Sequence, residues 1–351
     1  MSGVKEALEA QVQRGEPVRR ASFQGADLSG ARLAGAIFEQ VDLRGAGLHG
    51  ADLSESVFEG CDLTGASLSA VRAERAIWSS CVLDGVGAPG AQMAYAALTK
   101  CSLKSVDLSN TDLRHAAVAE GVLVDADLRR TDLEKTTFVS CSDLHADLSG
   151  ATLRETVFVE SDLGRARFGE LDAEKVVFVK CLFGEPDLSG LTLPMFQFME
   201  CDLSRACLEK CVLDGCDFHA SQLFEAKLGG AVGRRCLFAD AVLDGADLRE
   251  GDFSQSIFSA ASLRGTNLSA AKLEQCVFQE ADASAARFVG AALSYADFSG
   301  ACLSGADLSH AELFRARLHR VQDDGAIFTS RATALGDDPE LLEAELWQPR
   351  T

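Results

Sequence analysis

Residues 146–155 read A-D-L-S-G-A-T-L-R-E, which is two successive copies of a five-residue unit. The unit is a small residue, a polar residue, a Leu or Phe, and two further polar or Gly residues; its Leu or Phe is called the centre below. The unit extends outward through residues 137–156 and then along most of the chain. A period of five fits neither the 3.6-residue turn of a helix nor the two-residue alternation of a strand. A fixed period of this kind indicates a repeat architecture.

The phase of this repeat is unbroken from Phe23 to Phe328. A centre falls at every residue number that ends in 3 or 8, and Leu, Phe, Met or Trp fills all but eight of these positions. The exceptions are Ala73, Ala88, Val118, Asp143, Ala173, Gly233, Ala283 and Asp323. The chain thus resembles the pentapeptide-repeat family, whose pattern A-[D/N]-L-x-x occurs literally at residues 26–28, 51–53, 246–248 and 306–308. The resemblance implies an all-β solenoid: a right-handed, quadrilateral parallel β-helix with four pentapeptides per coil.

A second period supports four sides independently of that resemblance. Eleven of the 20 Phe residues lie on one line of centres spaced by 20 residues. They are Phe38, Phe58, Phe138, Phe158, Phe178, Phe198, Phe218, Phe238, Phe258, Phe278 and Phe298. A 20-residue period predicts a coil of four five-residue sides, with aromatic rings stacked in a column at the strand spacing of about 4.8 Å.

The repeat divides the chain into three segments. We expect an N-terminal capping segment over 1–20, a β-helix of about 15 coils over 21–328, and a C-terminal segment over 329–351 with a short capping or dimerisation helix. At about 4.8 Å per coil, the β-helix would form a rod on the order of 70 Å long. Solenoid ends need caps because an open coil exposes unpaired backbone groups. The N-terminal helix is predicted over 4–14, with Val4, Leu8 and Val12 on one apolar face.

The C-terminal segment contains a helix signal at residues 336–347. Asp338 is a predicted N-cap and Pro339 the first helical residue. The apolar face of this helix would consist of Leu341, Leu342, Leu346 and Trp347. The helix could fold over the last coil as a lid or form a dimer contact. The second alternative follows from the resemblance, because pentapeptide-repeat proteins that act on gyrase dimerise through their C-terminal ends.

The cysteines follow the repeat as well. Ten of the 12 occupy the small-residue position two before a centre: Cys61, Cys81, Cys101, Cys141, Cys181, Cys201, Cys211, Cys216, Cys236 and Cys276. The chain contains no C-x-x-C pair, and a line of in-register thiols does not surround a tetrahedral ion. We therefore interpret these cysteines as reduced packing residues, which favours a reducing compartment.

Three stretches depart from the pattern. Residues 85–90, with Pro89, predict a distorted corner, and residues 185–200 predict a widened or bulged coil because large side chains occupy small-residue positions. In 141–145 a carboxylate, Asp143, stands at a centre, where an unpaired charge would be costly. We expect either a local shift that turns Leu144 inward or a hydrogen-bonded Asp143.

An apolar strip is predicted on the outside of the Phe side. It consists of Val139, Val157, Val159, Val177, Val179 and Met199. β-Branched residues suit a straight, strand-like side, but an exposed apolar strip also commonly marks a contact surface. The strip is therefore the predicted site for a protein partner, and a homodimer with two-fold symmetry is an allowed alternative.

Composition and motifs disfavour an enzyme. The six histidines form no pair on the 20-residue lattice, and the sequence contains no phosphate loop and no nucleophile motif. We expect no catalytic residue, no cofactor and no metal. The net charge of −20 disfavours direct nucleic-acid binding. Without an apolar run long enough for a membrane span or an N-terminal signal peptide, the sequence predicts a soluble, cytoplasmic protein.

Two functions remain. The first is a non-enzymatic scaffold for protein–protein interaction. The end segments resemble those of long pentapeptide-repeat proteins encoded near bacterial type VI secretion components, so a secretion component is one candidate partner. The alternative, which the family resemblance implies and the acidic charge supports, is a DNA mimic that modulates DNA gyrase or topoisomerase IV and gives quinolone resistance. The charge density is lower than that of DNA, since one negative charge falls about every 3.5 Å of rod against about every 1.7 Å of duplex.

Overall fold

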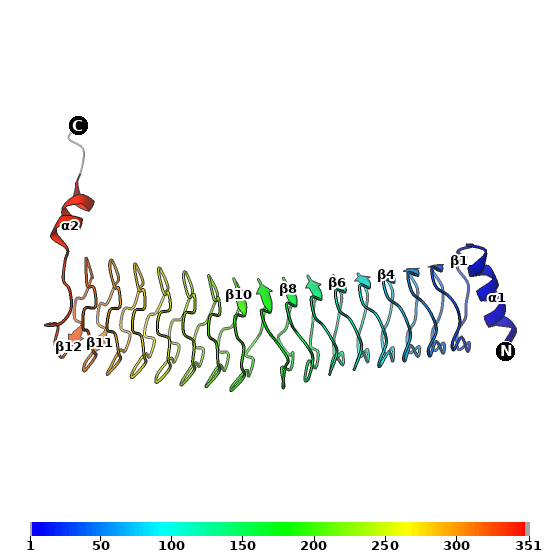
Figure 1. Ribbon diagram of the computed structural model, residues 1–351, viewed down its shortest axis with the longest axis horizontal. Coiled ribbons are helices and arrows are strands. Elements are labelled where there is room, and N and C mark those ends of the chain that lie inside the picture. Colours follow the sequence, from blue (N-terminus) through cyan, green and yellow to red (C-terminus); the bar gives the residue numbers. More distant parts are fainter. Residues whose placement is uncertain (1, 348–351) are drawn as a thin grey trace. The chain divides into compact units, whose positions relative to one another are not determined.

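The computed structural model describes residues 2–347, and the chain forms two compact units, Met1–Phe183 and Gly184–Thr351. Both units are parallel β-solenoids whose successive coils pair at a spacing of 20 residues (Figure 1). In the first unit Ser22 pairs with Asp42, and in the second unit Asp187 pairs with Cys207. The 20-residue coil predicted from the Phe line is therefore confirmed within each unit. That residues 21–328 act as one body stays a prediction from the unbroken period.

Each regular corner is a four-residue turn that begins at a centre. The Ala31 N–H donates to the Leu28 carbonyl at 3.0 Å. Gly30, the third residue of the turn, has a φ of +63°, which is the left-handed conformation that a type II turn requires. Between coils, the Leu28 N–H donates to the Gly47 carbonyl, and the Gly47 N–H donates to the Ala26 carbonyl. The turn bonds close the corner, and the ladder bonds hold successive coils in register.

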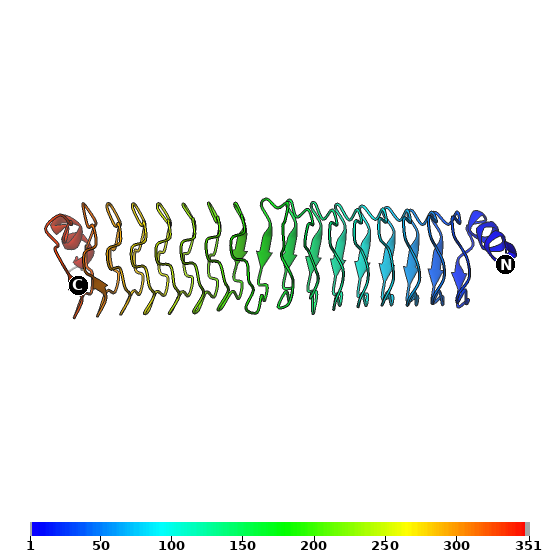
Figure 2. The ribbon, with the colours of Figure 1, turned by 90° about the horizontal axis from the view of Figure 1, so that it is seen from below.

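The first unit contains a helix and nine short parallel strands. Their bounds are α1 Ser2–Gln13, β1 Val18–Arg19, β2 Ile37–Glu39, β3 Val57–Glu59, β4 Ile77–Ser79, β5 Ala97–Thr99, β6 Ala117–Ala119, β7 Thr137–Val139, β8 Val157–Val159 and β9 Val177–Val179. The strands pair in chain order and form a row of parallel arrows in Figure 2. All of them lie on the Phe side, so the prediction that this side is strand-like is confirmed for the first unit.

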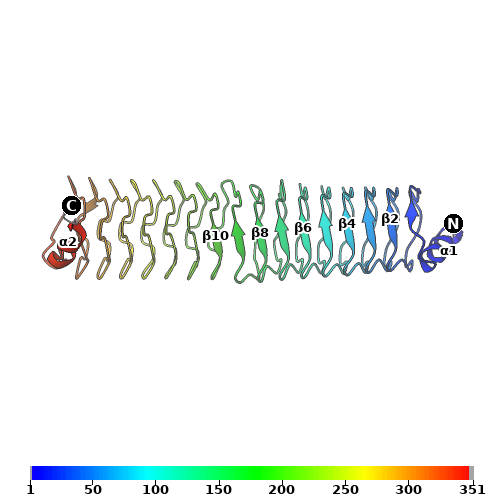
Figure 3. The ribbon, with the colours of Figure 1, turned by 90° about the horizontal axis from the view of Figure 1, so that it is seen from above.

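Helix α1 covers the first coil (Figure 3). Of its predicted apolar face, Leu8 is buried, Val12 is half-buried and Val4 is exposed. The helix therefore buries only the middle and end of that face. The side chain of Leu8 closes the open end of the core, as a capping residue must in a solenoid.

Polar side chains of α1 also bind backbone groups at the open edge of the first coil. The Glu9 carboxylate accepts a hydrogen bond from the Arg32 N–H at 2.8 Å, and Glu9 is itself buried. The Lys5 ammonium donates to the Ser29 carbonyl at 2.6 Å. These bonds satisfy edge groups that would otherwise be free to pair with another strand.

The core of each unit is built around stacked rings. In the first unit the ring centroids of Phe138 and Phe158 are 4.9 Å apart and those of Phe158 and Phe178 are 5.0 Å apart. In the second unit the stack runs through Phe198, Phe218, Phe238, Phe258, Phe278 and Phe298. The aromatic column predicted from the sequence is thus present in both units.

Thiols and hydroxyls at the small-residue position hydrogen-bond to the previous coil, a role that the sequence did not reveal. Cys61 donates to the Phe38 carbonyl at 3.4 Å, Thr156 to the Leu133 carbonyl at 2.8 Å, and Cys276 to the Phe253 carbonyl at 3.0 Å. All ten cysteines at this position are buried, and burial raises the pKa of Cys276 to about 12. The position therefore favours a small side chain that can also donate to a carbonyl.

The second unit contains three short strands and a helix, β10 Gln197–Met199, β11 Asp307–Leu308, β12 Ile327–Phe328 and α2 Pro339–Leu346. After β10 its Phe side adopts turns like the other sides, since the Ser221 N–H donates to the Phe218 carbonyl. The flat, strand-like Phe side is thus a feature of the strands up to β10. The two strands β11 and β12 pair in parallel on another side.

The predicted distortion at 85–90 is wrong. The Ala91 N–H donates to the Ala88 carbonyl at 3.2 Å, and Gly90 has a φ of +69°, so this corner is a regular turn. Pro89 occupies the second turn position, where the fixed φ of proline is favourable. This position contributes no N–H to the ladder in a regular coil, so proline removes no bond there.

The predicted local shift at 141–145 is confirmed. Leu144 is fully buried and takes the core place, while Asp143 is half-buried. The Leu144 N–H, rather than that of residue 143, donates to the Asp162 carbonyl at 2.7 Å. Asp143 absorbs the shift with a φ of +48°. The chain therefore accepts one residue of strained backbone instead of burying a carboxylate.

The stretch 185–200 accommodates its large residues unequally. Pro186 and Leu191 occupy small-residue positions but are only half-buried, whereas Phe196 is buried. The corner after Leu188 remains a turn, because the Leu191 N–H donates to the Leu188 carbonyl at 3.2 Å. The coil thus keeps its turn and admits one extra aromatic side chain into the core.

Candidate protein-contact surface

The five valines of the predicted strip lie on three adjacent strands of the first unit. Val139 pairs with Val159, which pairs with Val179, and Val157 pairs with Val177. The centres of these three strands point into the core, so the valines beside them point outward. All five valines are half-buried. We call this set the valine face. Its flatness follows from the absence of a turn in the three-residue strands β7, β8 and β9.

The outward line of the same sheet is apolar further toward the N-terminus. Ile37 and Ile77 are 42% and 46% exposed, and both lie in register with Val57 between them. The strip predicted from the sequence begins at Val139 and does not include these side chains. Their signal was present in the 20-residue lattice, because they precede centres on the Phe line.

Charged and hydroxyl groups border the valine face at the following corner. Ser140 donates to Glu160 across adjacent coils at 3.5 Å. The same line of corner positions is charged before the valine face as well, where Lys100, after β5, lies 3.7 Å from Glu120, after β6. An apolar centre with a polar rim is the arrangement found in protein interfaces. The sixth predicted strip residue, Met199, lies in β10 of the second unit and is half-buried there.

The C-terminal helix α2 begins as predicted. The Asp338 carboxylate accepts from the Glu340 and Leu341 N–H groups at 3.1 Å, and Pro339 is the first helical residue. Glu345 accepts a hydrogen bond from Arg320 at 2.8 Å. These contacts attach α2 to the preceding corner through polar groups.

The predicted apolar face of α2 is largely open. Leu341 and Trp347 are 42% and 71% exposed, and Leu342 is half-buried. The side chain of Leu346 lies outside the described part of the structure. The contact role of this face, whether as a cap or in a dimer, stays a prediction.

Arginines pair with many of the acids. Arg114 lies 2.7 Å from Asp112, and Arg129 lies 2.5 Å from Asp127. Hydrogen bonds from these guanidinium groups hold the pKa values of Asp112 and Asp127 below their usual range. The acidic surface is therefore a mosaic of ion pairs rather than a uniform array of negative charge.

An exposed aromatic pair in the second unit escaped the sequence reasoning. Tyr295 and Phe314 are each 50% exposed, and their rings meet edge to face at a centroid distance of 5.6 Å. The Arg315 guanidinium lies 5.9 Å from the Phe314 ring centroid. Both aromatics stand at corner positions, where the five-residue pattern places polar or Gly residues.

Within residues 2–347, no helix combines the length and the apolar character needed to cross a bilayer.

Comparison with known proteins identifies the repeat. The family model "Pentapeptide repeats" matches in eight copies, over residues 21–60, 107–142, 187–219, 197–232, 216–255, 261–299 and 291–329. These ranges cover more than half of the chain. No curated protein sequence matches the chain.

Several solved structures are similar to parts of the chain. HetL, a pentapeptide repeat protein involved in heterocyst differentiation regulation from Nostoc sp. strain PCC 7120, is 22% identical over 77% of this chain and 87% of its own, with a TM-score of 0.25. Full-length QnrB1, a plasmid-mediated fluoroquinolone resistance protein, is 14% identical over 94% of this chain and 99% of its own, with a TM-score of 0.18. Rfr23, a pentapeptide repeat protein from Cyanothece 51142, is 18% identical over 43% of this chain and 88% of its own, with a TM-score of 0.12.

At these identities and TM-scores the likenesses carry no argument about function. The family assignment rests instead on the repeat itself. The model matches along most of the repeat region, and the coils pair at 20-residue spacing in both units. The chain therefore belongs to the pentapeptide-repeat family, whose members are right-handed quadrilateral β-helices.

Proposed function

We propose that the protein is a non-catalytic scaffold that binds a protein partner through the valine face. The observation that carries this proposal is the in-register placement of Val139, Val157, Val159, Val177 and Val179 on the outside of β7, β8 and β9. Outward valines contribute little to the core, whereas covering each on association could contribute roughly 1 kcal/mol or more. A scaffold accessory to a type VI secretion system is one form of this function, and it rests only on the resemblance of the end segments.

The test places charge on the face without touching the core. In the double variant Val159→Glu, Val179→Glu, we expect the chain to fold normally and to lose its partner, because two carboxylates would be buried on binding without counter-charges. The measurement is affinity capture with quantitative mass spectrometry, together with the association state from light scattering. A second copy of the chain as the partner would appear as a loss of dimer.

A matched control changes two outward valines on the neighbouring side. Val82 and Val122 lie on one outward line and both pair with Ser102 between them, so Val82→Glu, Val122→Glu adds the same charge, with the two carboxylates two coils apart instead of one. The control is expected to retain the partner. If the two double variants give the same capture profile and association state as the wild type, the valine face is only a strand-like surface.

Modulation of DNA gyrase or topoisomerase IV by DNA mimicry is the second candidate. It is favoured by the net charge of −20 and by in-register carboxylates such as Asp107, Asp127 and Asp147. Two features weaken it. The rise of about 4.8 Å per coil exceeds the axial rise of about 3.4 Å per phosphate of one DNA strand. Arg129 and Arg167 also pair with Asp127 and Asp147.

A gyrase supercoiling assay separates the two candidates. We expect no change in supercoiling and no protection from quinolone when the purified protein is added, because arginines pair with many of its acids and interrupt the array of negative charge. A dose-dependent effect on supercoiling that is lost at high salt would instead support DNA mimicry, since such binding is electrostatic.

A further inference from the structure

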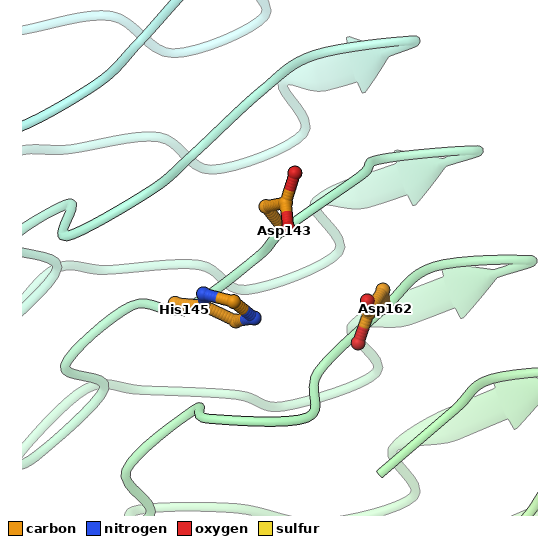
Figure 4. A group of neighbouring side chains, drawn as sticks. All are labelled: Asp143, His145 and Asp162. Carbon is orange, nitrogen blue, oxygen red and sulfur yellow. The ribbon is translucent and has the colours of Figure 1, made fainter. Parts of the chain in front are cut away.

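A histidine and two aspartates of the first unit lie around a common space. Asp143 and His145 come from one coil and Asp162 from the next, and Figure 4 shows the three side chains together at this point. One ligand atom from each residue, a carboxylate oxygen or an imidazole nitrogen, lies within 4.8 Å of the other two. All three residues are half-buried, so their side chains have less freedom than those of a fully exposed cluster.

The one-residue shift at Leu144 creates this group. With Leu144 in the core, Asp143 is turned outward, and the His145 N–H donates to the Asp143 carbonyl at 2.7 Å. The Leu144 N–H bonds to the Asp162 carbonyl and so holds the two coils together beside the three side chains. In an unshifted coil, Asp143 would be a core residue and the three groups would not meet.

The three side chains retain free ligand atoms. Asp162 uses Oδ1 to accept the Gly164 N–H at 2.9 Å, which leaves Oδ2 available. In the described chain, 2–347, neither the Asp143 carboxylate nor the His145 ring takes part in a hydrogen bond or ion pair. Two carboxylates this close repel each other. A cation bound between them would attract both and offset that repulsion.

The charged side chains of the neighbouring cavity balance one another. Beside His145 is a cavity of about 490 Å³. Its charged lining is Asp125, Asp127, Asp147, Arg129, Arg165 and Arg167. These three acids and three arginines balance, and two of the pairs, Arg129 with Asp127 and Arg167 with Asp147, are in direct contact. The lining of this cavity therefore supplies no net positive charge to offset Asp143 and Asp162.

We propose that Asp143, His145 and Asp162 bind a divalent transition-metal ion of the zinc type. An imidazole nitrogen with two carboxylate oxygens suits Zn²⁺, whereas Mg²⁺ and Ca²⁺ prefer oxygen ligands alone. Metal–ligand distances of about 2.0–2.2 Å in a tetrahedral site place the ligand atoms about 3.4 Å from one another. Atoms within 4.8 Å of one another must therefore close by up to about 1.4 Å, which rotation of half-buried side chains allows. Three protein ligands leave a fourth position open for water or for a side chain of a partner.

The site does not depend on the proposed function, but it borders the valine face. Val139 precedes Asp143 by four residues, and Val159 precedes Asp162 by three, so the same two coils carry both features. Loss of metal binding and loss of partner binding can be measured separately, so failure of one proposal leaves the other intact.

The test is a Zn²⁺ titration of the full-length chain, stripped of metal and kept reduced, by calorimetry. We expect one Zn²⁺ per chain. In His145→Gln and in Asp162→Asn, removal of a ligand should weaken binding by at least about tenfold. Asp162→Asn retains the oxygen that accepts the Gly164 N–H, so its fold should be preserved. Thermal unfolding in the presence of chelator should give the same midpoint for the wild type and both variants.

The matched control is His219→Gln, because His219 lies 3.7 Å from a single carboxylate, Asp240, in the second unit. This variant should bind Zn²⁺ like the wild type. Titration with Co²⁺ should give the visible bands of a nitrogen- and oxygen-ligated ion without a thiolate charge-transfer band. A wild type that binds no Zn²⁺, equal affinity in His145→Gln and the wild type, or a thiolate band would overturn the proposal.

Discussion

Replacing Phe158 by Ala is expected to lower the free energy of unfolding by about 3–5 kcal/mol. Phe158 is fully buried, and it stacks on Phe138 on one side and Phe178 on the other. The variant leaves a cavity in a coil whose backbone is held in register by both neighbours, so the site cannot collapse to fill it. Urea denaturation followed by circular dichroism measures the loss.

The matched control is Phe158→Leu. Leucine already occupies this line at Leu98, which is buried, so the control should cost less than about 1.5 kcal/mol. Because each coil contacts only its neighbours, hydrogen exchange in Phe158→Ala should rise most in residues 137–180. A cost for Phe158→Ala as small as that of the leucine control would show that the ring column does not carry the stability of the first unit.

Replacing Leu144 by Ala is expected to cost about 2–5 kcal/mol, while Asp143→Ala should change stability by no more than about 0.5 kcal/mol. The reason is the one-residue shift, which buries Leu144 fully and leaves Asp143 half-buried. The unshifted five-residue phase would give the reverse order. Thermal or urea unfolding of both variants in the presence of chelator keeps metal binding out of the comparison. A larger loss in Asp143→Ala than in Leu144→Ala would contradict the shifted register.

Most of the fold could be predicted because one simple rule governs it. Every fifth residue must be buried, and every twentieth residue stacks on its counterpart in the next coil, as Phe138, Phe158 and Phe178 do. Both periods can be counted directly from the sequence. The N-cap at Asp338 was also predictable, since a capping carboxylate followed by proline is a local signal.

The errors and omissions arose where the periodic pattern does not describe the backbone. The five-residue pattern predicts a disruption at Pro89, but the second turn position contributes no ladder N–H and accepts proline. The ten buried cysteines were read as small apolar residues, yet thiols such as that of Cys61 also donate to carbonyls 23 residues earlier. A hydrogen bond of this kind depends on the stagger between coils, which residue spacing alone does not give.

The candidate surfaces were predictable to different degrees. The valine face could be found because the outward positions on one side follow directly from the 20-residue lattice. The predicted strip does not include the apolar continuation of this line at Ile37 and Ile77. The group of Asp143, His145 and Asp162 could not be found in the same way, because the lattice assigns Asp143 to the core. A single-residue shift moves it next to a side chain of the following coil, and only the structure shows that shift.

Whether a protein partner binds the valine face is decided by the ratio of two dissociation constants. The partner recovered with the wild type is titrated against Val159→Glu, Val179→Glu and against Val82→Glu, Val122→Glu. Two lost apolar contacts of roughly 1 kcal/mol each, together with two buried charges, predict at least about 30-fold weaker binding for the valine-face variant. The control should bind like the wild type. Equal dissociation constants for the two variants would show that the partner does not bind the valine face.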